Sequence, residues 1–263
     1  GTVDAGPGND VIQSSDQPSV LIGGGGTDQI TGGGGNDVIS DGDTDLTANS
    51  DTMDGGGGLD ELTYIVRTRP VMVNLGATSG AGAIGEDDRI QHFEAAQGGS
   101  GNDELTASQS GLPGDSLRSV YLPQLRGNDG ADVLKAGNFA ANIIGGAGND
   151  RIIGSREKEL LEGDDGDDRI QAGAGNDLVD GGRGHDTLDG QSGDDKIYGD
   201  SGNDRIAGGR GHDAVNTGLG SDVVKVLDGQ RDTVSCSRNA KRDRITVDRI
   251  DVLRRNCSKA SVR

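Results

Sequence analysis

The chain repeats a nine-residue pattern, and this repeat constrains its fold more than any other feature. Between Gly127 and Lys225 it divides into eleven nonads without a gap. Position 4 is glycine in nine of these nonads, position 6 is aspartate in the same nine, and position 8 is Leu, Ile or Val in all eleven. Further nonads begin at Ala5, Ser14, Gly23 and Gly32, and single copies span 55–63 and 98–106. A repeat of this kind predicts a solenoid, in which each unit packs only against its neighbours.

Each position of the nonad has a physical reason. Glycine allows the positive φ and the close backbone approach that a tight turn requires. The three residues after the aspartate form a short strand whose centre, position 8, points inward, while positions 7 and 9 point outward. Two nonads make one coil, so residue i stacks on residue i+18 and parallel strands form two small sheets. The sequence therefore predicts an all-β, parallel β-roll.

The composition implies that something other than apolar burial stabilises this roll. Only 30% of the residues are hydrophobic and 49 of 263 are glycine, whereas an ordinary domain is about 45–50% apolar. Residues 1–230 carry a net charge of −25 and residues 231–263 a net charge of +6. An acidic body repels nucleic acid and anionic membrane surfaces and attracts cations. Calcium takes six to eight oxygen ligands, and its binding free energy becomes folding free energy.

The nonads resemble the RTX (repeats-in-toxin) calcium-binding family over most of the chain. The resemblance implies a right-handed β-roll with one calcium ion between stacked turns. The ion takes the carbonyls of positions 2 and 4 and the aspartate of one turn, and the carbonyls of positions 1 and 3 and the aspartate of the next. One site would use Asp164, Gly166 and Asp168 with Gly181, Arg183 and Asp186. The other implied metal-site residues are Asp10, Asp28, Asp37, Asp60, Asp103, Asp132, Asp150, Asp177, Asp195, Asp204, Asp213, Asp222, Gly146, Gly148, Gly182, Gly184, Gly199 and Ser201.

The two edges of the main roll are expected to hold unequal numbers of ions. One edge has aspartate at all of its sixth positions, from Asp132 to Asp222, which gives five inter-turn sites. On the other edge Ala141 supplies no carboxylate, and the next turn carries Glu159 and lacks the position-4 glycine. Only the last two gaps of that edge are therefore expected to fill. We expect about seven calcium ions in residues 127–225 and a few more in the N-terminal repeats.

Two insertions and an acidic run interrupt the array. Residues 64–97 contain the apolar runs Tyr64–Val66 and Val71–Leu75, which predict a strand pair that continues the roll. Residues 107–126 form the most apolar insertion, which predicts either a loop over one sheet end or a partner-binding protrusion. Asp41, Asp43 and Asp45 alternate as at the start of an EF-hand loop, but the required glycine and glutamate are missing. Either a solvated turn or an extra calcium site is expected there.

The C-terminal segment loses the strict period and is basic. Asp232, Asp243 and Asp251 still precede aliphatic residues by two positions, so decayed coils that cap the roll are expected. Cys236 and Cys257 suit one disulfide in an oxidising compartment, and two buried free thiols are the alternative. The expected organisation is an N-terminal roll (1–63), a strand-pair insertion (64–97), a single repeat with a loop insertion (98–126), the main roll (127–225) and a disulfide-linked cap (226–263).

A search for catalytic patterns favours a module without enzyme activity. There is no H-E-x-x-H and no G-x-S-x-G, and His185 and His212 occupy the variable position 5, where surface residues are expected. The G-x-G-x-x-G run at 80–85 precedes no predicted helix, so it predicts a glycine-rich loop and not a dinucleotide site.

The most favoured function is therefore an extracellular calcium-binding structural module that folds on calcium binding. The alternatives are an adhesin or polysaccharide-binding module, which Arg151, Arg169 and Arg205 at position 7 support, and an enzyme in its own right. No apolar run approaches the length of a membrane span. We expect a secreted bacterial monomer, and a mature or excised fragment because no signal peptide or initial Met is present.

Overall fold

The chain folds into short strands joined by turns. The structure, a computed structural model, describes residues 1–43, 49–83, 85–107, 122–237, 243–254, 256–257 and 260–262. These ranges contain no helix, and so none that could cross a membrane. The strands divide into two compact units, Gly1–Gly137 and Asn138–Arg263. Each unit is a parallel β-solenoid, as the nonads predicted.

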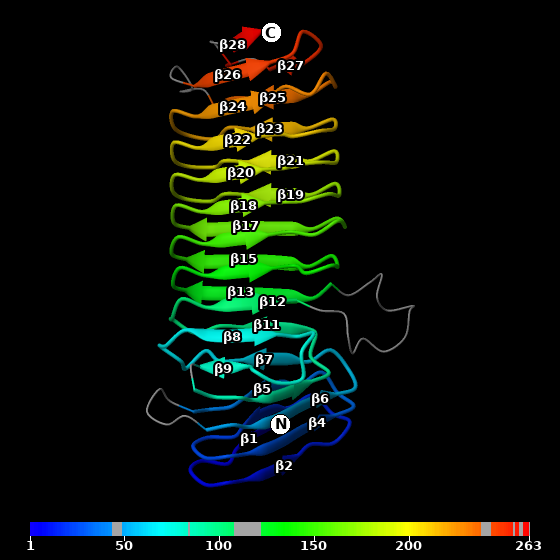
Figure 1. The fold of residues 1–263 in the computed structure, drawn as a ribbon, viewed down its shortest axis with the longest axis vertical. Helices are drawn as coiled ribbons and strands as arrows, with labels where there is room; N and C mark the ends of the chain where they lie inside the picture. The colour runs from blue at the N-terminus through cyan, green and yellow to red at the C-terminus, as the bar shows by residue number, and fades with distance from the viewer. Residues whose placement is uncertain are drawn as a thin grey trace. The chain divides into compact units, whose positions relative to one another are not determined.

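The second unit is the more regular of the two (Figure 1). Its odd-numbered strands form one sheet in the order β15 (Asn142–Ala147), β17 (Leu160–Asp165), β19 (Leu178–Asp180), β21 (Lys196–Tyr198), β23 (Ala214–Asn216), β25 (Thr233–Ser235) and β27 (Val252–Leu253). Its even-numbered strands form another in the order β16 (Arg151–Ile153), β18 (Arg169–Gln171), β20 (Thr187–Asp189), β22 (Arg205–Ala207), β24 (Val223–Val226), β26 (Arg244–Val247) and β28 (Ala260–Val262). Ile152 lies opposite Ile170 and Ile170 opposite Leu188, so two nonads make one coil as predicted.

The core of this unit is a row of aliphatic side chains in each sheet. Ile152, Ile170, Leu188 and Ile206, all at position 8, are at most 2% exposed. Their neighbours at positions 7 and 9 are partly or fully exposed. This alternation is the period-2 pattern of strands with one face buried, and each coil therefore buries only a thin apolar layer.

The first unit contains three sheets and longer coils. One sheet has the order β1 (Thr2–Asp4), β3 (Val20–Ile22), β5 (Val38–Ser40), β7 (Glu61–Thr63), β11 (Ala95–Gln97) and β13 (Gln124–Asp129). A second has the order β2 (Val11–Gln13), β4 (Gln29–Gly33), β6 (Thr52–Gly56) and β10 (Arg89–Gln91). The third has the order β9 (Gly82–Ala83), β8 (Val71–Asn74), β12 (Glu104–Thr106) and β14 (Val133–Lys135). Insertions in the turns lengthen the coils, so that Glu61 pairs with Val38 on one side and with Ala95 on the other.

The insertion at 64–97 differs from its prediction in one place. Val71–Asn74 forms β8 as expected, and Gly82–Ala83 folds back against it as an antiparallel strand. Tyr64–Val66, however, is a turn and not a strand, closed by a hydrogen bond from Arg67 N to Tyr64 O (2.9 Å). Tyr64 is fully buried whereas Ile65 and Val66 are more than half exposed. The strand prediction was wrong because this apolar run combines one core residue with two surface residues. Asp45 and residues 108–121, which hold most of the apolar insertion, lie outside the described residues.

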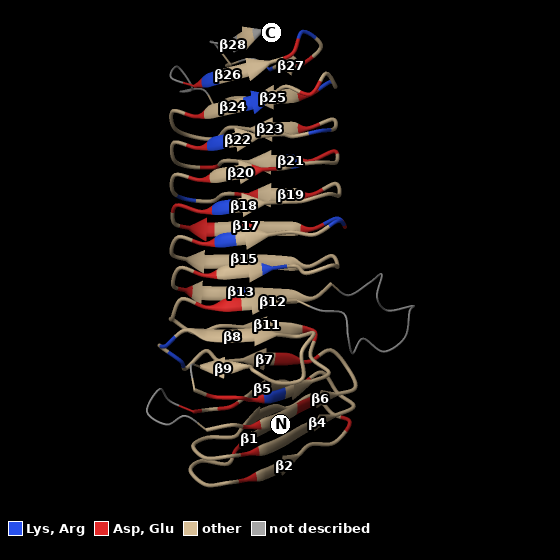
Figure 2. Cartoon of the chain, in the orientation of Figure 1, with Lys and Arg blue, Asp and Glu red and all other residues tan. Residues whose placement is uncertain are grey.

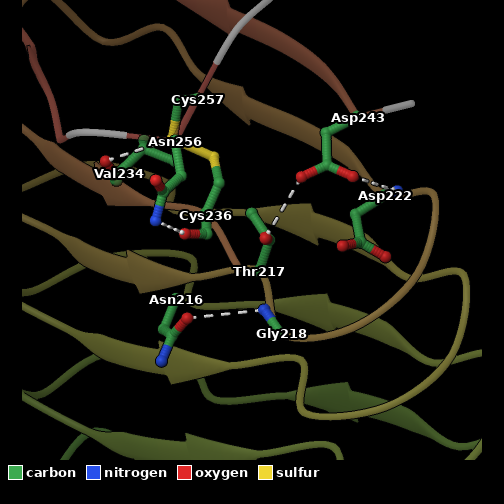
Figure 3. Close-up of a disulfide and its surroundings, with 9 residues drawn as sticks. All are labelled: Asn216, Thr217, Gly218, Asp222, Val234, Cys236, Asp243, Asn256 and Cys257. Atoms are coloured by element: carbon green, nitrogen blue, oxygen red, sulfur yellow. Dashed lines mark hydrogen bonds between the residues drawn. A yellow bond between two sulfur atoms is a disulfide. The ribbon is translucent and has the colours of Figure 1, made fainter. Parts of the chain in front are cut away.

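A disulfide closes the C-terminal coils, as predicted. Cys236 directly follows β25, Cys257 follows β27, and the two are bonded with their Cα atoms 5.1 Å apart (Figure 3). The side-chain amide of Asn256 also donates a hydrogen bond to the Cys236 carbonyl (3.3 Å). The decayed repeats therefore do form coils, and a covalent link joins the last two of them in this sheet.

Removing the disulfide is expected to loosen the cap and leave the preceding coils folded. The two cysteines are 21 residues apart, and closing a loop of that length stabilises a fold by about 3 kcal/mol in the chain-entropy model. In the Cys236→Ser/Cys257→Ser double variant, amide exchange should accelerate in β25 to β27. Equal acceleration in β16 to β20 would contradict a local role for the bridge.

Candidate metal sites along the turns

The aspartates at position 6 are linked from turn to turn by hydrogen bonds. The amide of Asp150 donates to Asp168 Oδ1 (2.8 Å), that of Asp168 to Asp186 Oδ1 (2.8 Å), and that of Asp186 to Asp204 Oδ1 (3.0 Å). The same bond joins Asp204 to Asp222, Asp177 to Asp195 and Asp195 to Asp213. The repeats therefore stack their carboxylates in two columns, one along each edge of the unit.

The second carboxylate oxygen of most column aspartates is buried without a hydrogen-bond donor. In unit 2 these are the Oδ2 atoms of Asp168, Asp177, Asp186, Asp195, Asp204, Asp213 and Asp222, and in unit 1 those of Asp10, Asp28, Asp37 and Asp60. Asp132 and Asp150 occupy equivalent positions in their turns and are equally buried. A buried carboxylate oxygen without a donor is costly, so the columns are suited to a bound cation.

The donor-free oxygen lies beside a carbonyl oxygen of the next turn. A Cβ placed on Gly163 would lie 2.3 Å from Asp168 Oδ2 and 2.5 Å from Gly181 O, so both oxygens converge at this glycine. A Cβ on Gly199 would likewise lie 2.7 Å from Asp204 Oδ2 and 2.5 Å from Thr217 O. Carboxylate and carbonyl oxygens are the ligands that calcium prefers, and glycine keeps the space between them open.

The residues of the site predicted from Asp164 to Asp186 all lie in two directly stacked turns. Arg183 N donates to Asp164 O (2.7 Å) and Gly166 N donates to Arg183 O (2.8 Å). The next pair of turns repeats these bonds, from Ser201 N to Gly182 O (2.9 Å) and from Gly184 N to Ser201 O (2.8 Å). A carbonyl that accepts one hydrogen bond keeps a second lone pair. The predicted ligands therefore fit a calcium ion in chemistry and in placement, and Gly146, Gly148 and Gly199 hold the same positions in their own turns.

At position 6 of the nonads, the carboxylates of Asp103 and Glu159 have both of their oxygens occupied by protein donors. Asp103 Oδ1 accepts from Val71 N (2.9 Å) and Asp103 Oδ2 from Gly99 N (2.8 Å). The Ser155 amide donates to both oxygens of Glu159, and the Ser155 hydroxyl to one of them. Ala141, in the preceding turn of the Glu159 edge, is fully buried and brings no carboxylate. The turns of Ala141 and Glu159 therefore offer no open carboxylate oxygen, as expected for gaps on that edge that bind calcium weakly or not at all.

Unit 1 has two such columns, and both continue through acidic residues that the nonad register does not mark. Asp28 N donates to Asp51 Oδ1 (2.7 Å), Asp51 N to Asp88 Oδ1 (2.8 Å), and Asp60 N to Glu94 Oε2 (2.8 Å). These bonds span 23, 37 and 34 residues, because insertions separate the turns. The available sequence signal was an acidic residue two positions before a buried aliphatic or Met residue, and not the nine-residue period.

The columns also extend into the C-terminal cap. Asp213 N donates to Asp232 Oδ1 (2.8 Å), and Asp222 N donates to Asp243 Oδ1 (3.1 Å, Figure 3). Asp232 Oδ2 is buried without a donor, like the oxygens of the regular turns, whereas Asp243 Oδ2 accepts from the Thr217 hydroxyl (3.3 Å). Asp232 therefore adds one further carboxylate of the calcium-binding type beyond residue 225.

The two repeat histidines belong to the turns. His185 Nδ1 accepts from Asn203 N (2.8 Å), and His212 N donates to Asp194 Oδ1 (2.8 Å). Both bonds join neighbouring turns of the same edge at the surface. The histidines thus support the stacking of the turns on which they lie.

Burial raises the pKa values of the column aspartates. The pKa of Asp168 rises to about 7 because desolvation disfavours its charged form, with repulsion from Asp150 and Asp186 adding to the effect. Asp177 and Asp204 also reach about 7, and Asp195 and Asp213 about 6, mainly through desolvation. In the metal-free fold these carboxylates therefore lose their protons only as pH rises through about 6 to 7.

The metal-free protein is accordingly expected to be more structured at acidic pH than at pH 8. An aspartate with a raised folded-state pKa favours the fold below its unfolded value of 3.8, and this contribution is lost as pH rises through 6 to 7. Far-UV circular dichroism of dialysed, metal-free protein between pH 4.5 and 8 should show decreasing β signal. A β signal that grows with pH would contradict this reading of the buried carboxylates.

The repeats identify the family. The RTX calcium-binding nonapeptide repeat matches the chain in four copies, at residues 4–39, 126–157, 154–188 and 189–224, which together cover just over half of it. The chain belongs to this family, and it is a calcium-binding repeat protein. A comparison with curated proteins finds no match.

Proposed function

We propose that the protein is an extracellular structural module whose roll folds when calcium binds between its turns. The observation that carries the proposal is the stack of buried aspartate oxygens without donors along both edges of unit 2. The disulfide supports an oxidising, extracellular location, because such bonds persist outside the cytosol. The proposal includes secretion by a bacterium, a monomeric state and no catalytic activity.

In this proposal, different residues of each turn order the backbone, hold the calcium ion and close the core. Asp168 Oδ1 orders the turn by accepting the Asp150 amide, and Asp168 Oδ2 stays available beside Gly181 O. Calcium, when bound, supplies the positive charge that neutralises such oxygens. The glycines at positions 1 and 4 admit the carbonyls of the neighbouring turn, and the position-8 aliphatic side chain closes the core beneath. Each gap filled in this way would join two coils.

Direct calcium counting tests the proposal. Metal-free protein, dialysed against roughly millimolar calcium, the range of extracellular modules, is expected to retain about seven ions in residues 127–225 and a few more in the N-terminal repeats. Magnesium should be retained poorly, because it requires smaller, near-octahedral sites. A chain that retains no calcium under these conditions would overturn the proposal.

A second candidate function is binding of an acidic polysaccharide by one sheet face. Arg151 and Arg169 are paired neighbours on β16 and β18, Arg205 follows on β22 and Arg244 on β26, all at outward positions. Figure 2 shows Lys and Arg on β18, β22 and β26. A shallow pocket of about 290 Å³ on β20 to β24 is lined by Arg205 and by exposed Lys225.

Charge-removing variants separate this candidate from the structural one. The triple variant Arg151→Gln/Arg169→Gln/Arg205→Gln should lose retention on an immobilised uronic-acid polymer while its calcium count stays unchanged. The matched control is Arg183→Gln, since Arg183 is exposed in a turn and paired with Asp165. Equal retention of the triple variant and the control would exclude the candidate.

A further inference from the structure

The turn that carries Asp88 differs from the regular turns in how its carboxylate is satisfied. Asp88 continues the column of Asp28 and Asp51 through the same amide-to-Oδ1 bond (2.8 Å). Its second oxygen, which would have no donor in a regular turn, accepts a hydrogen bond from the Tyr64 hydroxyl (2.8 Å). Both residues are at most 1% exposed. The insertion thus places a protein donor where the regular repeats leave an open oxygen.

A buried arginine lies in the same cluster. Arg67 is 1% exposed, and its guanidinium donates to Asp41 Oδ2 (Nε, 3.1 Å) and to Glu86 Oε2 (Nη2, 3.0 Å). Asp41 begins the turn that carries Asp51, and Glu86 lies two residues before Asp88. Carboxylate oxygens of Asp41, Glu86 and Asp88 lie within 4.8 Å of one another. The guanidinium therefore contacts acidic residues from both of the turns that a calcium ion would bridge.

We infer that Arg67 and Tyr64 replace a calcium ion between the turn of Asp51 and the turn of Asp88. Arg67 supplies a permanent positive charge with several N–H donors, and Tyr64 supplies the donor for the remaining Asp88 oxygen. The inference rests on the proposed calcium-dependent roll, and it assigns one coil of unit 1 to protein-supplied contacts. That coil keeps its connection at calcium concentrations too low to fill the regular gaps.

Hydrogen exchange of the intact chain along a calcium titration tests the inference. The reporters in the inserted coil are the amides of Arg89 and Ala95, which donate to Asp51 O (2.8 Å) and Asp60 O (3.1 Å). The reporters in the regular coils are the amides of Arg169 and Thr187, which donate to Asp150 O and Asp168 O (both 2.8 Å). Residues 86–97 are expected to become protected at lower calcium than residues 163–190. Equal calcium midpoints for the two segments overturn the inference. If hydrogen exchange does not depend on calcium in either segment, the proposed function is overturned instead.

Substitution of the arginine tests its role directly. In Arg67→Met the calcium midpoint of residues 86–97 is expected to rise to that of residues 163–190, because the cluster then has no built-in cation. Arg69→Met, the same change at an exposed position two residues away, should keep the lower midpoint. Unchanged protection in Arg67→Met overturns the inference. So does the loss of one bound calcium relative to Arg69→Met, since that would place a metal ion in this cluster.

If Arg67→Met fails to fold in saturating calcium, Tyr64→Phe provides a second, milder test of the same cluster. This change removes only the hydroxyl that donates to Asp88 Oδ2 and leaves the ring in the core. The calcium midpoint of residues 86–97 is expected to rise, while that of residues 163–190 stays in place. A midpoint identical to the unsubstituted protein overturns the inference.

Discussion

Chelation of calcium is expected to convert unit 2 from a β-solenoid into a largely disordered chain. Each of its nonads buries one aliphatic side chain at position 8, while a buried carboxylate oxygen without a donor accompanies most of them. Without a cation, neighbouring ionised aspartates in a column repel one another, and their burial costs free energy that the thin core does not offset. Far-UV circular dichroism at neutral pH should therefore lose its β signal on addition of a chelator.

Restoring calcium should recover the β signal, and the same amount of magnesium should not. The comparison between the two ions is the control, because both screen charge equally but only calcium accepts six to eight oxygen ligands at flexible distances. A chelated sample that keeps its full β spectrum and melting temperature would show that the roll is stable without metal.

Asp186→Ala is expected to remove two bound calcium ions and to lower thermal stability strongly. Asp186 is fully buried and lies at the centre of the most regular column. Its Oδ1 accepts the Asp168 amide (2.8 Å), and its own amide donates to Asp204 Oδ1 (3.0 Å), so the residue borders the gaps on both sides. The substitution also leaves the buried Asp168 amide without its acceptor, which by itself costs about 1–3 kcal/mol. Calcium counting and thermal melts at saturating calcium measure both effects.

Glu159→Ala is the matched control on the opposite edge. Both oxygens of Glu159 already accept hydrogen bonds from Ser155, and the preceding turn of that edge carries Ala141. This substitution is therefore expected to leave the calcium count unchanged and to cost less stability than Asp186→Ala. If both variants lost the same number of ions, the assignment of filled and weak gaps to the two edges would be wrong.

The cooperativity of the roll follows from the way its aspartates are shared. Asp168, Asp186 and Asp204 each accept an amide from one turn and donate their own amide to the next. A solenoid of this type is stabilised by interfaces between nearest neighbours. Loss of one carboxylate is therefore expected to weaken two interfaces. Asp251 accepts the Asp232 amide (3.0 Å) and ends its column in the described part of the chain, so its loss should matter less than that of a residue at the centre.

The main roll could be predicted from the sequence because its chemistry is local and periodic. Position 8 of each nonad is the only aliphatic position that recurs without exception, so Ile152 and Ile170 had to face the core together. With two nonads per coil, the spacing of 18 residues also placed Asp168 above Asp186, which the structure confirms. The disulfide between Cys236 and Cys257 was the only pairing open to two cysteines, and it too is present.

The column residues of unit 1 that follow insertions could not be predicted from the sequence, because a turn can lengthen without changing which strands stack. Asp51 and Asp88 are 37 residues apart, yet they meet through the same hydrogen bond as residues 18 apart in the main roll. The pairing of β6 with β10 brings the two residues together, and no repeat period in the sequence predicts that pairing.

Only the tertiary structure places a positive charge inside the insertion. The sequence predicts a strand at Tyr64 to Val66 and places Arg67 between this strand and the next predicted one, with no role assigned to its charge. In the fold Tyr64 and Arg67 are buried against Asp88, Asp41 and Glu86. The physical reason is that a carboxylate buried by strand stacking must find a donor or a cation, and which side chain lies close enough to supply it is decided by the three-dimensional path of the chain.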